Sequence, residues 1–358
     1  MFTKKMFVLL GVLVLAAVVV TACGTAGPAG PAGPAGPEGP AGPAGAAGES
    51  VSVADLTCTE CHNDTAVISS KKASWNESLH GSGVAFIEEG GNKSCAFCHS
   101  GAAFSAAVAA GQNFSQLESG DANPTHQDCR TCHQIHVTYT GDDWALETTA
   151  PVTTVTSGAT FDGGAGNLCA NCHQARRYMA NFASKDSAGV VIPDKFTPTM
   201  RFNTHYSVQV DTLMATVDVN AALGVDGKPA AHYTMVEDTC VGCHMGENDN
   251  HRFLPEVARC VACHADAESL DVNGAVTAFE EKVAQLHDAL IAKGLMTENA
   301  DGTVSNVLKD AAGNPVQLDP PQAAALFTYH LIEEDGSNSV HNPNYFNALV
   351  DASLEALK

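Results

Sequence analysis

The apolar positions near the start of the chain form one unbroken run. Residues 6–20 contain no charged or polar side chain, and Lys4 and Lys5 come just before them. A run of about 15 residues is too short to predict a membrane span, and behind positive charges it is typical of an export signal. We therefore expect the chain to leave the cytoplasm and this segment to lie outside the folded part.

A different pattern marks the last quarter of the chain. Apolar residues recur there every three or four positions, at Val276, Phe279, Val283, Leu286 and Leu290. This period predicts an amphipathic helix, which Gly294 would end. Two more helices are expected at 323–332 and 345–357, and at most a short strand pair at 148–156. The predicted fold class is mainly α with extensive irregular loops and little β.

The export signal ends in a cysteine motif. Residues 20–24 read Val-Thr-Ala-Cys-Gly, and small residues before a cysteine resemble the lipobox of bacterial lipoproteins. The resemblance implies a lipoprotein signal peptide over residues 1–22 and lipidation of Cys23. An ordinary signal peptide is the alternative. A lipid would hold the chain on a membrane without crossing it.

A low-complexity tract follows, with glycine at every third position from Gly27 to Gly48, mostly as Gly-Pro-Ala. A collagen triple helix requires this spacing, because only glycine fits at its axis. The simpler interpretation is a stiff polyproline-II spacer, roughly 65 Å long at about 3.1 Å per residue. Residues 23–50 are thus predicted to be a lipid anchor and spacer, with self-association through the tract as the alternative.

The charge of the chain limits its partners. It has 18 basic and 40 acidic residues, a formal net charge of −22. No basic patch large enough for nucleic acid is expected, and cationic proteins, cationic surfaces or small electron shuttles fit better. Most of the acidic residues need no role beyond solubility.

The cysteines carry the chemistry of the chain. There are 13, and all except Cys23 fall in six copies of Cys-x-x-Cys-His, so none remains for a structural disulfide. The copies are Cys58, Cys61, His62; Cys95, Cys98, His99; Cys129, Cys132, His133; Cys169, Cys172, His173; Cys240, Cys243, His244; and Cys260, Cys263, His264.

This spacing suits covalent haem attachment. Two thiols three positions apart reach the two vinyl groups on one edge of a haem, and the next histidine is held under the iron as its proximal ligand. A single copy would leave a zinc site or a redox dithiol open, but neither needs the histidine. Six copies predict six covalently bound haem c groups, which are attached outside the cytoplasm.

The second axial ligand of each iron must come from elsewhere. Nine histidines remain, enough to favour bis-histidine ligation over methionine, the rival ligand that raises the reduction potential. His287 lies in a helix pattern and His330 in an apolar stretch, so both are predicted to be structural. The distal candidates are His80, His126, His136, His205, His232, His251 and His341. His126 and His136 lie too close to the third motif to reach over their own haem and are expected to serve a neighbouring one.

Several short motifs carry a family resemblance. They are Trp-x-x-Ser-x-His at 75–80, Cys-His-Gln-Ile-His at 132–136, Cys-Val-x-Cys-His-Met at 240–245, His-x-Phe-x-Pro at 251–255 and His-Asn-Pro-x-Tyr at 341–345. Over residues 55 to 355 the chain resembles multihaem cytochromes of dissimilatory metal-reducing bacteria, which include periplasmic and outer-surface lipoproteins. The resemblance implies haems in close pairs, mostly bis-histidine, forming a chain for electron hopping. The collagen-like tract departs from most members.

The motifs also set the domain organisation. They begin at residues 58, 95, 129, 169, 240 and 260, without a constant period. Residues 51–270 are predicted to bind the six haems, whose apolar surface would replace much of the side-chain core. Residues 271–358 are predicted to be a helical region that packs on the haem core and supplies His341. Without haem we expect no stable fold.

These observations predict an electron-transfer protein at or beyond the cell envelope, without catalytic residues. Its expected partners are other redox proteins or extracellular electron acceptors, metal oxides among them, and the membrane reached through its lipid. The alternative is a periplasmic reductase of nitrite, hydroxylamine or a sulfur oxyanion with one open haem, although no Cys-x-x-Cys-Lys variant occurs. The outer membrane or cell surface is preferred over the periplasmic face, and a shared haem ligand would also permit self-association.

Overall fold

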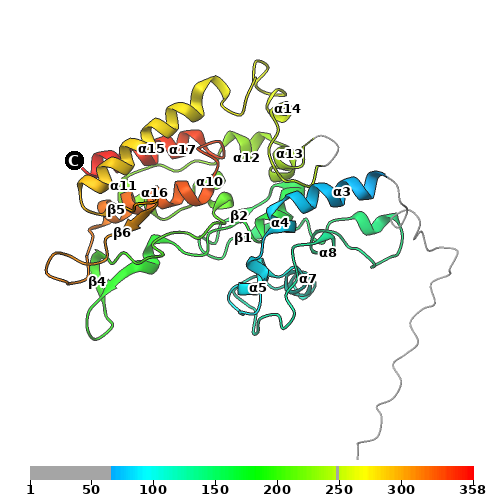
Figure 1. The fold of residues 1–358 in the computed structure, drawn as a ribbon, viewed down its shortest axis with the longest axis horizontal. Helices are drawn as coiled ribbons and strands as arrows, with labels where there is room; N and C mark the ends of the chain where they lie inside the picture. Colours follow the sequence, from blue (N-terminus) through cyan, green and yellow to red (C-terminus); the bar gives the residue numbers. More distant parts are fainter. Residues whose placement is uncertain (1–65, 247–249) are drawn as a thin grey trace, which may run out of the picture. The chain divides into compact units, whose positions relative to one another are not determined.

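The computed structural model describes residues 66–246 and 250–358, all within the unit formed by residues 51–358. This part of the chain is mainly helical with little sheet, as the sequence predicts (Figure 1). The predicted signal peptide, Cys23, the collagen-like tract and the first Cys-x-x-Cys-His motif lie outside the described residues. The domain boundaries stay predictions.

Short helices dominate up to residue 260. The first group is α3 (Ala66–Glu77), α4 (Leu79–Ser82), α5 (Ala85–Glu89) and α7 (Gly101–Ala109). Serine side chains cap two of them: Ser78 accepts from the Gly81 N–H at 3.2 Å, and Ser100 accepts from the Ala103 N–H at 3.4 Å. Such caps satisfy backbone donors that the first turn leaves unbonded, and they allow very short helices to form.

A second group of short helices coincides with the cysteine motifs. It comprises α6 (Ala96–His99), α8 (Cys129–Cys132), α9 (Asn167–Ala170), α13 (Cys240–His244) and α14 (Val257–Cys260). Between them lie α10 (Gln209–Met214), α11 (Val219–Leu223), α12 (Ala231–Met235) and the 3₁₀ turns η2 (Gly141–Trp144), η3 (Gly164–Gly166), η4 (Met179–Phe182) and η5 (Val272–Gly274). Most of the chain between motifs is loop, as predicted.

The strands of the described chain form three separate antiparallel pairs. They are β1 (Val152–Thr153) with β2 (Thr160–Phe161), β3 (Ala183–Lys185) with β4 (Val191–Phe196), and β5 (Met296–Glu298) with β6 (Val304–Asn306). The predicted strand at 148–156 exists as β1, but its partner lies just beyond that stretch. No larger sheet occurs in the described ranges, as predicted.

Three long helices form the C-terminal region: α15 (Ala275–Ala292), α16 (Pro320–Asp335) and α17 (Pro343–Ala356). All three were expected from the sequence, and α15 was predicted from its apolar spacing. Gly294, at φ 67°, lies two residues beyond α15, and Gly336, at φ 69°, directly follows α16, because glycine adopts the left-handed conformation without strain. Asp319 and Asn342 cap α16 and α17, each ahead of a proline that suits the first helical position.

The largest apolar core lies around α16. Seven consecutive residues of this helix, 323–329, are buried, so it is covered on all sides. Helices α15 and α17 pack against it, and so does the earlier segment that includes Phe202 and Val219. Smaller apolar clusters form around Phe97 and around Phe161. The side-chain core is therefore concentrated at the C-terminal helices.

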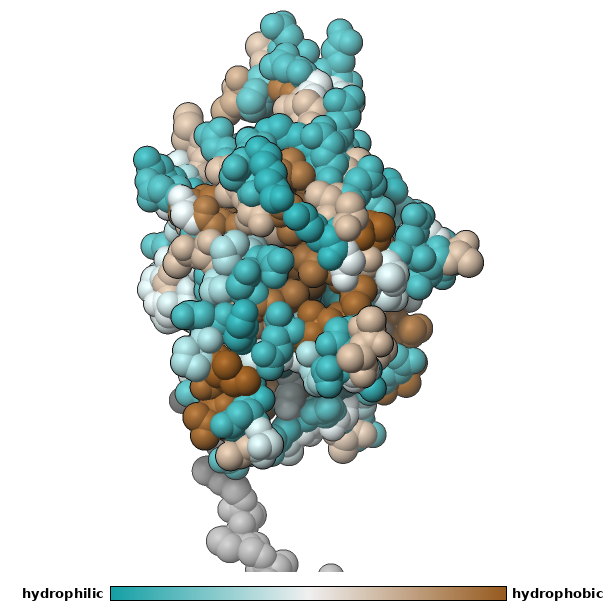
Figure 2. Space-filling model, turned by 90° about the vertical axis from the view of Figure 1, so that its left-hand side faces the viewer, coloured by the Kyte–Doolittle hydropathy of each residue, from teal (hydrophilic) through white to brown (hydrophobic). Residues whose placement is uncertain are grey.

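Elsewhere, large apolar side chains stand in solvent. The exposed fractions are 87% for Leu79, 85% for Met200 and 75% for Met235. Figure 2 shows apolar side chains gathered in the middle of one face, between polar ones. Among the described helices, none combines the length and apolar character needed to cross a bilayer. Single exposed apolar side chains are common on folded proteins, whereas apolar side chains gathered on one face are typical of a surface that binds a partner or ligand.

The α16 core gives the first testable prediction. Phe346 in α17 is fully buried, with its ring centre 5.9 Å from that of Phe279 in α15. Phe346→Ala should lower the free energy of unfolding by about 3–5 kcal/mol, because it removes buried surface and leaves a cavity. Denaturant unfolding followed by far-UV circular dichroism measures the loss. Glu355→Ala on the exposed side of α17 is the control, and equal losses for both variants would contradict this account of the core.

Candidate metal centres

Five of the six Cys-x-x-Cys-His motifs lie in the described chain, and each overlaps a short helix. In four of them the histidine N–H donates to the carbonyl oxygen of the first cysteine, at 2.8–3.0 Å. The chain therefore makes one helical turn between these two residues. Positions three and four apart share one side of such a turn, so both thiols and the imidazole lie together.

Each of these five motif histidines faces one histidine from another segment. The ring centres are 6.1–6.3 Å apart in every pair. The pairs are His173 with His80 at 6.2 Å, His99 with His205 at 6.1 Å, His133 with His251 at 6.2 Å, His264 with His232 at 6.3 Å, and His244 with His341 at 6.3 Å. All five partners are among the predicted distal candidates.

This separation fits two imidazoles that bind one metal ion from opposite sides. With metal–nitrogen bonds of about 2 Å and ring nitrogens roughly 1.1 Å from the ring centres, two such rings lie about 6.2 Å apart. Other aromatic contacts in the described chain vary from 4.0 to 6.4 Å, whereas the five histidine pairs share nearly one value. This shared separation between ring centres indicates that all five pairs serve the same kind of site.

The donor set fits haem. Among the described residues, no three or more histidine, cysteine, aspartate or glutamate side chains converge as a bare metal ion would need. Haem iron requires only two axial ligands from the protein, because the macrocycle supplies the other four. Two opposed imidazoles beside two free thiols are the groups that a covalently attached haem would use.

The second ring nitrogen orients many of these histidines. Five of them place Nδ1 at hydrogen-bonding distance from an acceptor: His133 2.7 Å from the Trp144 carbonyl, His244 2.9 Å from the Phe253 carbonyl, His232 2.6 Å from the Val340 carbonyl, His173 3.1 Å from Gln209 Oε1, and His341 2.9 Å from both Asp335 oxygens. An Nδ1–H that donates leaves the lone pair on Nε2, the nitrogen that would face the iron. These acceptors were not predicted, since carbonyls and single polar side chains carry no sequence signal.

The pair of His99 and His205 lies among positive charges. Burial, followed by the charges of Arg176 and Arg177, lowers the pKa of His205 to about 4. Arg176 also stands over the Phe114 ring, with its guanidinium carbon 5.0 Å from the ring centre. In a chain with a net charge of −22, this positive neighbourhood sets the second motif apart.

Thiols of different motifs also meet. The Cys172 thiol hydrogen-bonds to that of Cys98, and the bond, ahead of burial, raises the pKa of Cys172 well above its usual value. In the same way, Cys169 bonds to Cys240, and the bond, ahead of burial, raises the pKa of Cys169. Cys132 lies close enough to influence both Cys169 and Cys172. The fourth motif therefore adjoins the second, third and fifth.

Two distal candidates stand outside the five pairs. The ring of His126 contacts Phe86 at 4.0 Å and Trp75 at 6.0 Å, and its buried Nδ1 has no hydrogen-bond partner. His136 stacks on Tyr139 with ring centres 5.3 Å apart, and its backbone has φ 67°. His205, a member of a pair, shares this left-handed conformation at φ 72°.

The two histidines predicted to be structural have other contacts. His287 places Nδ1 3.1 Å from Asp288 Oδ1, with its ring 5.9 Å from Tyr329. His330 lies in α16, with Nε2 2.8 Å from Asn306 Oδ1. Neither belongs to the five pairs.

The burial of His330 gives a pH-dependent prediction. Burial lowers the pKa of His330 from 6.5 to about 4, so the unfolded chain gains a proton at a higher pH than the folded chain. The contribution of neutral His330 to the free energy of unfolding is therefore fully present above pH 6.5 and is lost as the pH falls toward 4. The free energy of unfolding should fall by about 2 kcal/mol from this residue between pH 7.5 and pH 5. Denaturant titrations at several pH values should show that the free energy of unfolding of His330→Gln changes less with pH than that of His287→Gln. An identical pH dependence in the two variants would refute the role of His330.

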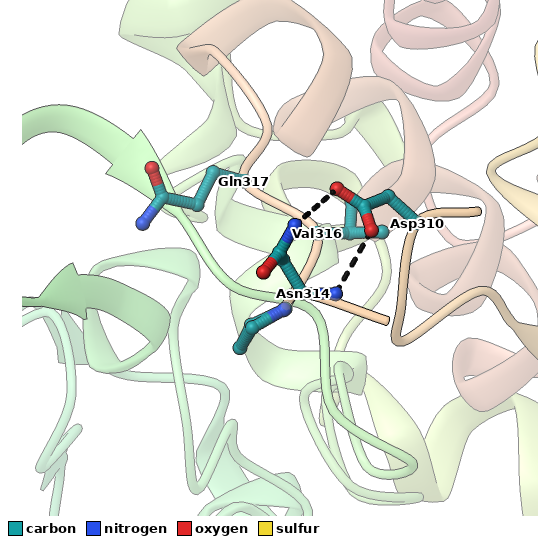
Figure 3. A pocket seen from close by; sticks show the side chains of 5 residues that line it. Asp310, Asn314, Val316 and Gln317 are labelled. Carbon is teal, nitrogen blue, oxygen red and sulfur yellow. Dashed lines mark hydrogen bonds between the residues drawn. The ribbon is translucent and has the colours of Figure 1, made fainter. Parts of the chain in front are cut away.

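A hollow in the C-terminal region offers no comparable chemistry. It is lined by Asp310, Asn314, Pro315, Val316 and Gln317. Figure 3 shows Asp310 turned toward Asn314, whose backbone N–H and side-chain amide donate to its carboxylate at 2.8 and 3.2 Å. The Asp310 carboxylate thus stabilises the local turn from Asp310 to Asn314 and is not directed to a ligand.

Comparisons with known proteins agree with the histidine and cysteine pattern. No family model matches the chain. It is 26% identical over 234 residues to the C-type polyheme cytochrome OmcC of Geobacter sulfurreducens (strain ATCC 51573 / DSM 12127 / PCA), a match that covers 53% of this chain and 29% of the relative. The C-type polyheme cytochrome OmcB of Geobacter sulfurreducens (strain DL-1 / KN400) is 25% identical over 234 residues, covering 53% of this chain and 30% of the relative. The chain thus spans less than a third of the length of these relatives.

Two solved structures are similar in part. The outer cell wall cytochrome OcwA matches 80% of this chain and 50% of its own, with a TM-score of 0.48 and 19% identity. The undecaheme cytochrome from the S-layer of Carboxydothermus ferrireducens matches 79% of this chain and 40% of its own, with a TM-score of 0.44 and 18% identity.

Proposed function

We propose that the chain is a multihaem c-type cytochrome that acts as an exported electron carrier with six covalently attached haems. The observation that carries this proposal is the common spacing of the five histidine pairs, 6.1–6.3 Å between ring centres. Each pair combines a histidine beside two free thiols with a histidine from another segment. Covalent attachment and two axial nitrogens are thereby available in each of the five motifs.

Haem iron supplies reversible one-electron chemistry when it is bound. The residues of the chain hold, orient and shield it. With haem bound, the two imidazoles of a pair would serve as its two protein ligands, and such a site would leave no open position for a substrate. This favours a carrier over a reductase of nitrite, hydroxylamine or a sulfur oxyanion, which needs one open position.

The contacts between motifs support a continuous route. The bonded thiols of Cys98 and Cys172, and of Cys169 and Cys240, bring the attachment edges of the second, fourth and fifth motifs side by side. Cys243 in turn lies within electrostatic reach of Cys260 in the sixth motif. The fourth motif is the junction of this arrangement, because its two thiols adjoin thiols of three other motifs.

Exposed apolar side chains next to the paired histidines fit the same proposal. Leu79, directly before His80, is 87% exposed, and Leu254, in the loop that follows His251, is 57% exposed. Leaving such side chains in water is unfavourable, and each would contribute about 1.5–3 kcal/mol if fully buried. The apolar faces of a haem held by the adjacent histidine would cover them.

The sixth site pairs His62 with His136 in our proposal. His136 and His205 share a left-handed backbone conformation, which is uncommon for histidine and is found most often at functional sites. Asp143 Oδ2 accepts the backbone N–H of His136 at 2.8 Å. His126 is instead held between Phe86 and Trp75. The first motif lies outside the described residues, and five of the seven distal candidates are already paired, which leaves His126 and His136 for His62.

The cellular setting is proposed from the sequence. The lipid on Cys23 and the collagen-like spacer would hold the haem region away from a membrane surface, with the cell surface preferred. The acidic surface suits cationic partners or small shuttles. Acceptors outside the cell, metal oxides among them, need no catalytic residue in this chain.

The proposal is tested on the intact, haem-loaded protein. Mass spectrometry and iron analysis should give six haems per chain, and low-temperature EPR of the oxidised protein should contain only low-spin signals. A high-spin signal near one sixth of the iron would mean that one haem is open. The carrier would then give way to the reductase alternative, with nitrite and hydroxylamine reduction as the next assays.

A pair of alanine variants tests the sixth site. His136→Ala should convert about one sixth of the iron to high spin, because one haem loses its distal ligand. His126→Ala should leave the iron low spin. Quantitative EPR of both variants at equal haem content decides between them, and the reverse pattern would assign the sixth site to His126.

A further inference from the structure

Asp335 gives the fifth motif a feature that its neighbours lack. Of the five Nδ1 contacts described above, four end on neutral oxygens, and that of His341 ends on a carboxylate. Building on the proposed function, we propose that Asp335 is a positioning residue that lowers the reduction potential of the haem held by His244 and His341.

The geometry of the pair is favourable for such a role. Both Asp335 oxygens lie 2.9 Å from His341 Nδ1, and the Asp335 side chain is only 1% exposed. A charge removed from water acts on its neighbour through a lower effective dielectric than at the surface. The carboxylate therefore polarises this imidazole more strongly than a backbone carbonyl does.

Other residues hold the carboxylate in place. It accepts hydrogen bonds from Thr212 Oγ1, from Ser337 Oγ and from the Ser337 N–H. Thr212 belongs to α10, so the carboxylate is fixed from both sides of the site.

His341 is also held in place by its neighbours in the chain. Gly336, at φ 69°, ends α16 and allows the chain to turn back within six residues. Asn342, next to His341, donates through its side chain to the Thr212 and Lys228 carbonyls at 3.1 and 2.9 Å. The turn between α16 and α17 thus presents a ligand and its charged acceptor together.

The electronic consequence follows from the direction of the hydrogen bond. A carboxylate that accepts from Nδ1–H increases the basicity of the ligating nitrogen. A more basic axial ligand stabilises ferric over ferrous iron, because the oxidised iron carries the greater positive charge. The haem at this site should then be harder to reduce than it would be with a neutral acceptor.

Asp335→Asn tests the inference in the haem-loaded protein. Asparagine keeps the size and one acceptor oxygen but removes the charge. In a spectroelectrochemical titration, one of the redox transitions should move to higher potential. A tenfold change in the ferric–ferrous equilibrium corresponds to about 59 mV for one electron.

Asp288→Asn is the matched control. Asp288 also faces a histidine, with Oδ1 3.1 Å from His287 Nδ1, but it is 85% exposed and His287 is outside the five pairs. This variant should leave every transition in place. If Asp335→Asn moves no transition further than Asp288→Asn does, the inference is wrong.

His341→Ala separates the inference from the proposed function. If the variant remains fully low spin, His341 is not a ligand and the site assignment itself fails. If high-spin iron appears but Asp335→Asn leaves the potentials unchanged, only the role of Asp335 fails.

A milder variant keeps the test open if Asp335→Asn does not take up its haems. Thr212→Val removes one donor from the carboxylate with little change in side-chain volume, and leaves more of its negative charge on His341. The same transition should then move to lower potential. No movement, or movement to higher potential, would overturn the inference.

Discussion

Opposed imidazole rings are the contact on which the rest of this structure depends. Each pair joins distant parts of the sequence: His232 and His264 are 32 positions apart, and His133 and His251 are 118 apart. Bringing such segments together costs loop-closure entropy, and short helices of four or five residues contribute little stability against it. A bond to one shared iron would offset that cost at the places where side-chain packing is thin.

The distribution of the core follows the same logic. Side chains alone fill the region around α16, where Phe327 and Leu331 are fully buried. The motif-bearing loops have only small clusters, and they leave groups such as Leu79 in water. The C-terminal helices therefore provide a conventional core, and the turn at their centre delivers His341 to the fifth motif. Charge is distributed unevenly as well, with arginines around His205 and a buried carboxylate beside His341.

Local features of the fold were predictable because they depend on local sequence. Apolar spacing predicted α15 and Gly294 as its end, and helices were also expected where α16 and α17 lie; Gly336 after α16 was not predicted. Of the short strand pair expected within 148–156, only β1 lies there; its partner β2 lies beyond that stretch, because pairing depends on a turn with weak sequence signals. The cysteine motifs predicted covalent haem. His287 and His330, which were predicted to be structural, lie outside the five histidine pairs.

The sequence did not show which distal histidine pairs with which motif histidine. Seven distal candidates and six motifs allow many combinations, and choosing His80 for His173 requires segments 93 positions apart to meet. Supporting groups were also missed: Asp335 reads as an ordinary acid near a helix end, and Gln209 as a polar residue in a loop. Such roles arise from tertiary contacts, which neither composition nor periodicity encodes.

The central claim is that one iron lies between the rings of each histidine pair. Diffraction from crystals of the haem-loaded protein, measured on both sides of the iron absorption edge, locates the irons without reference to the chain. We expect an anomalous peak midway between the rings of all five pairs, and a sixth beside His136. A peak displaced from these midpoints, or a pair of histidines with no iron between them, would contradict it.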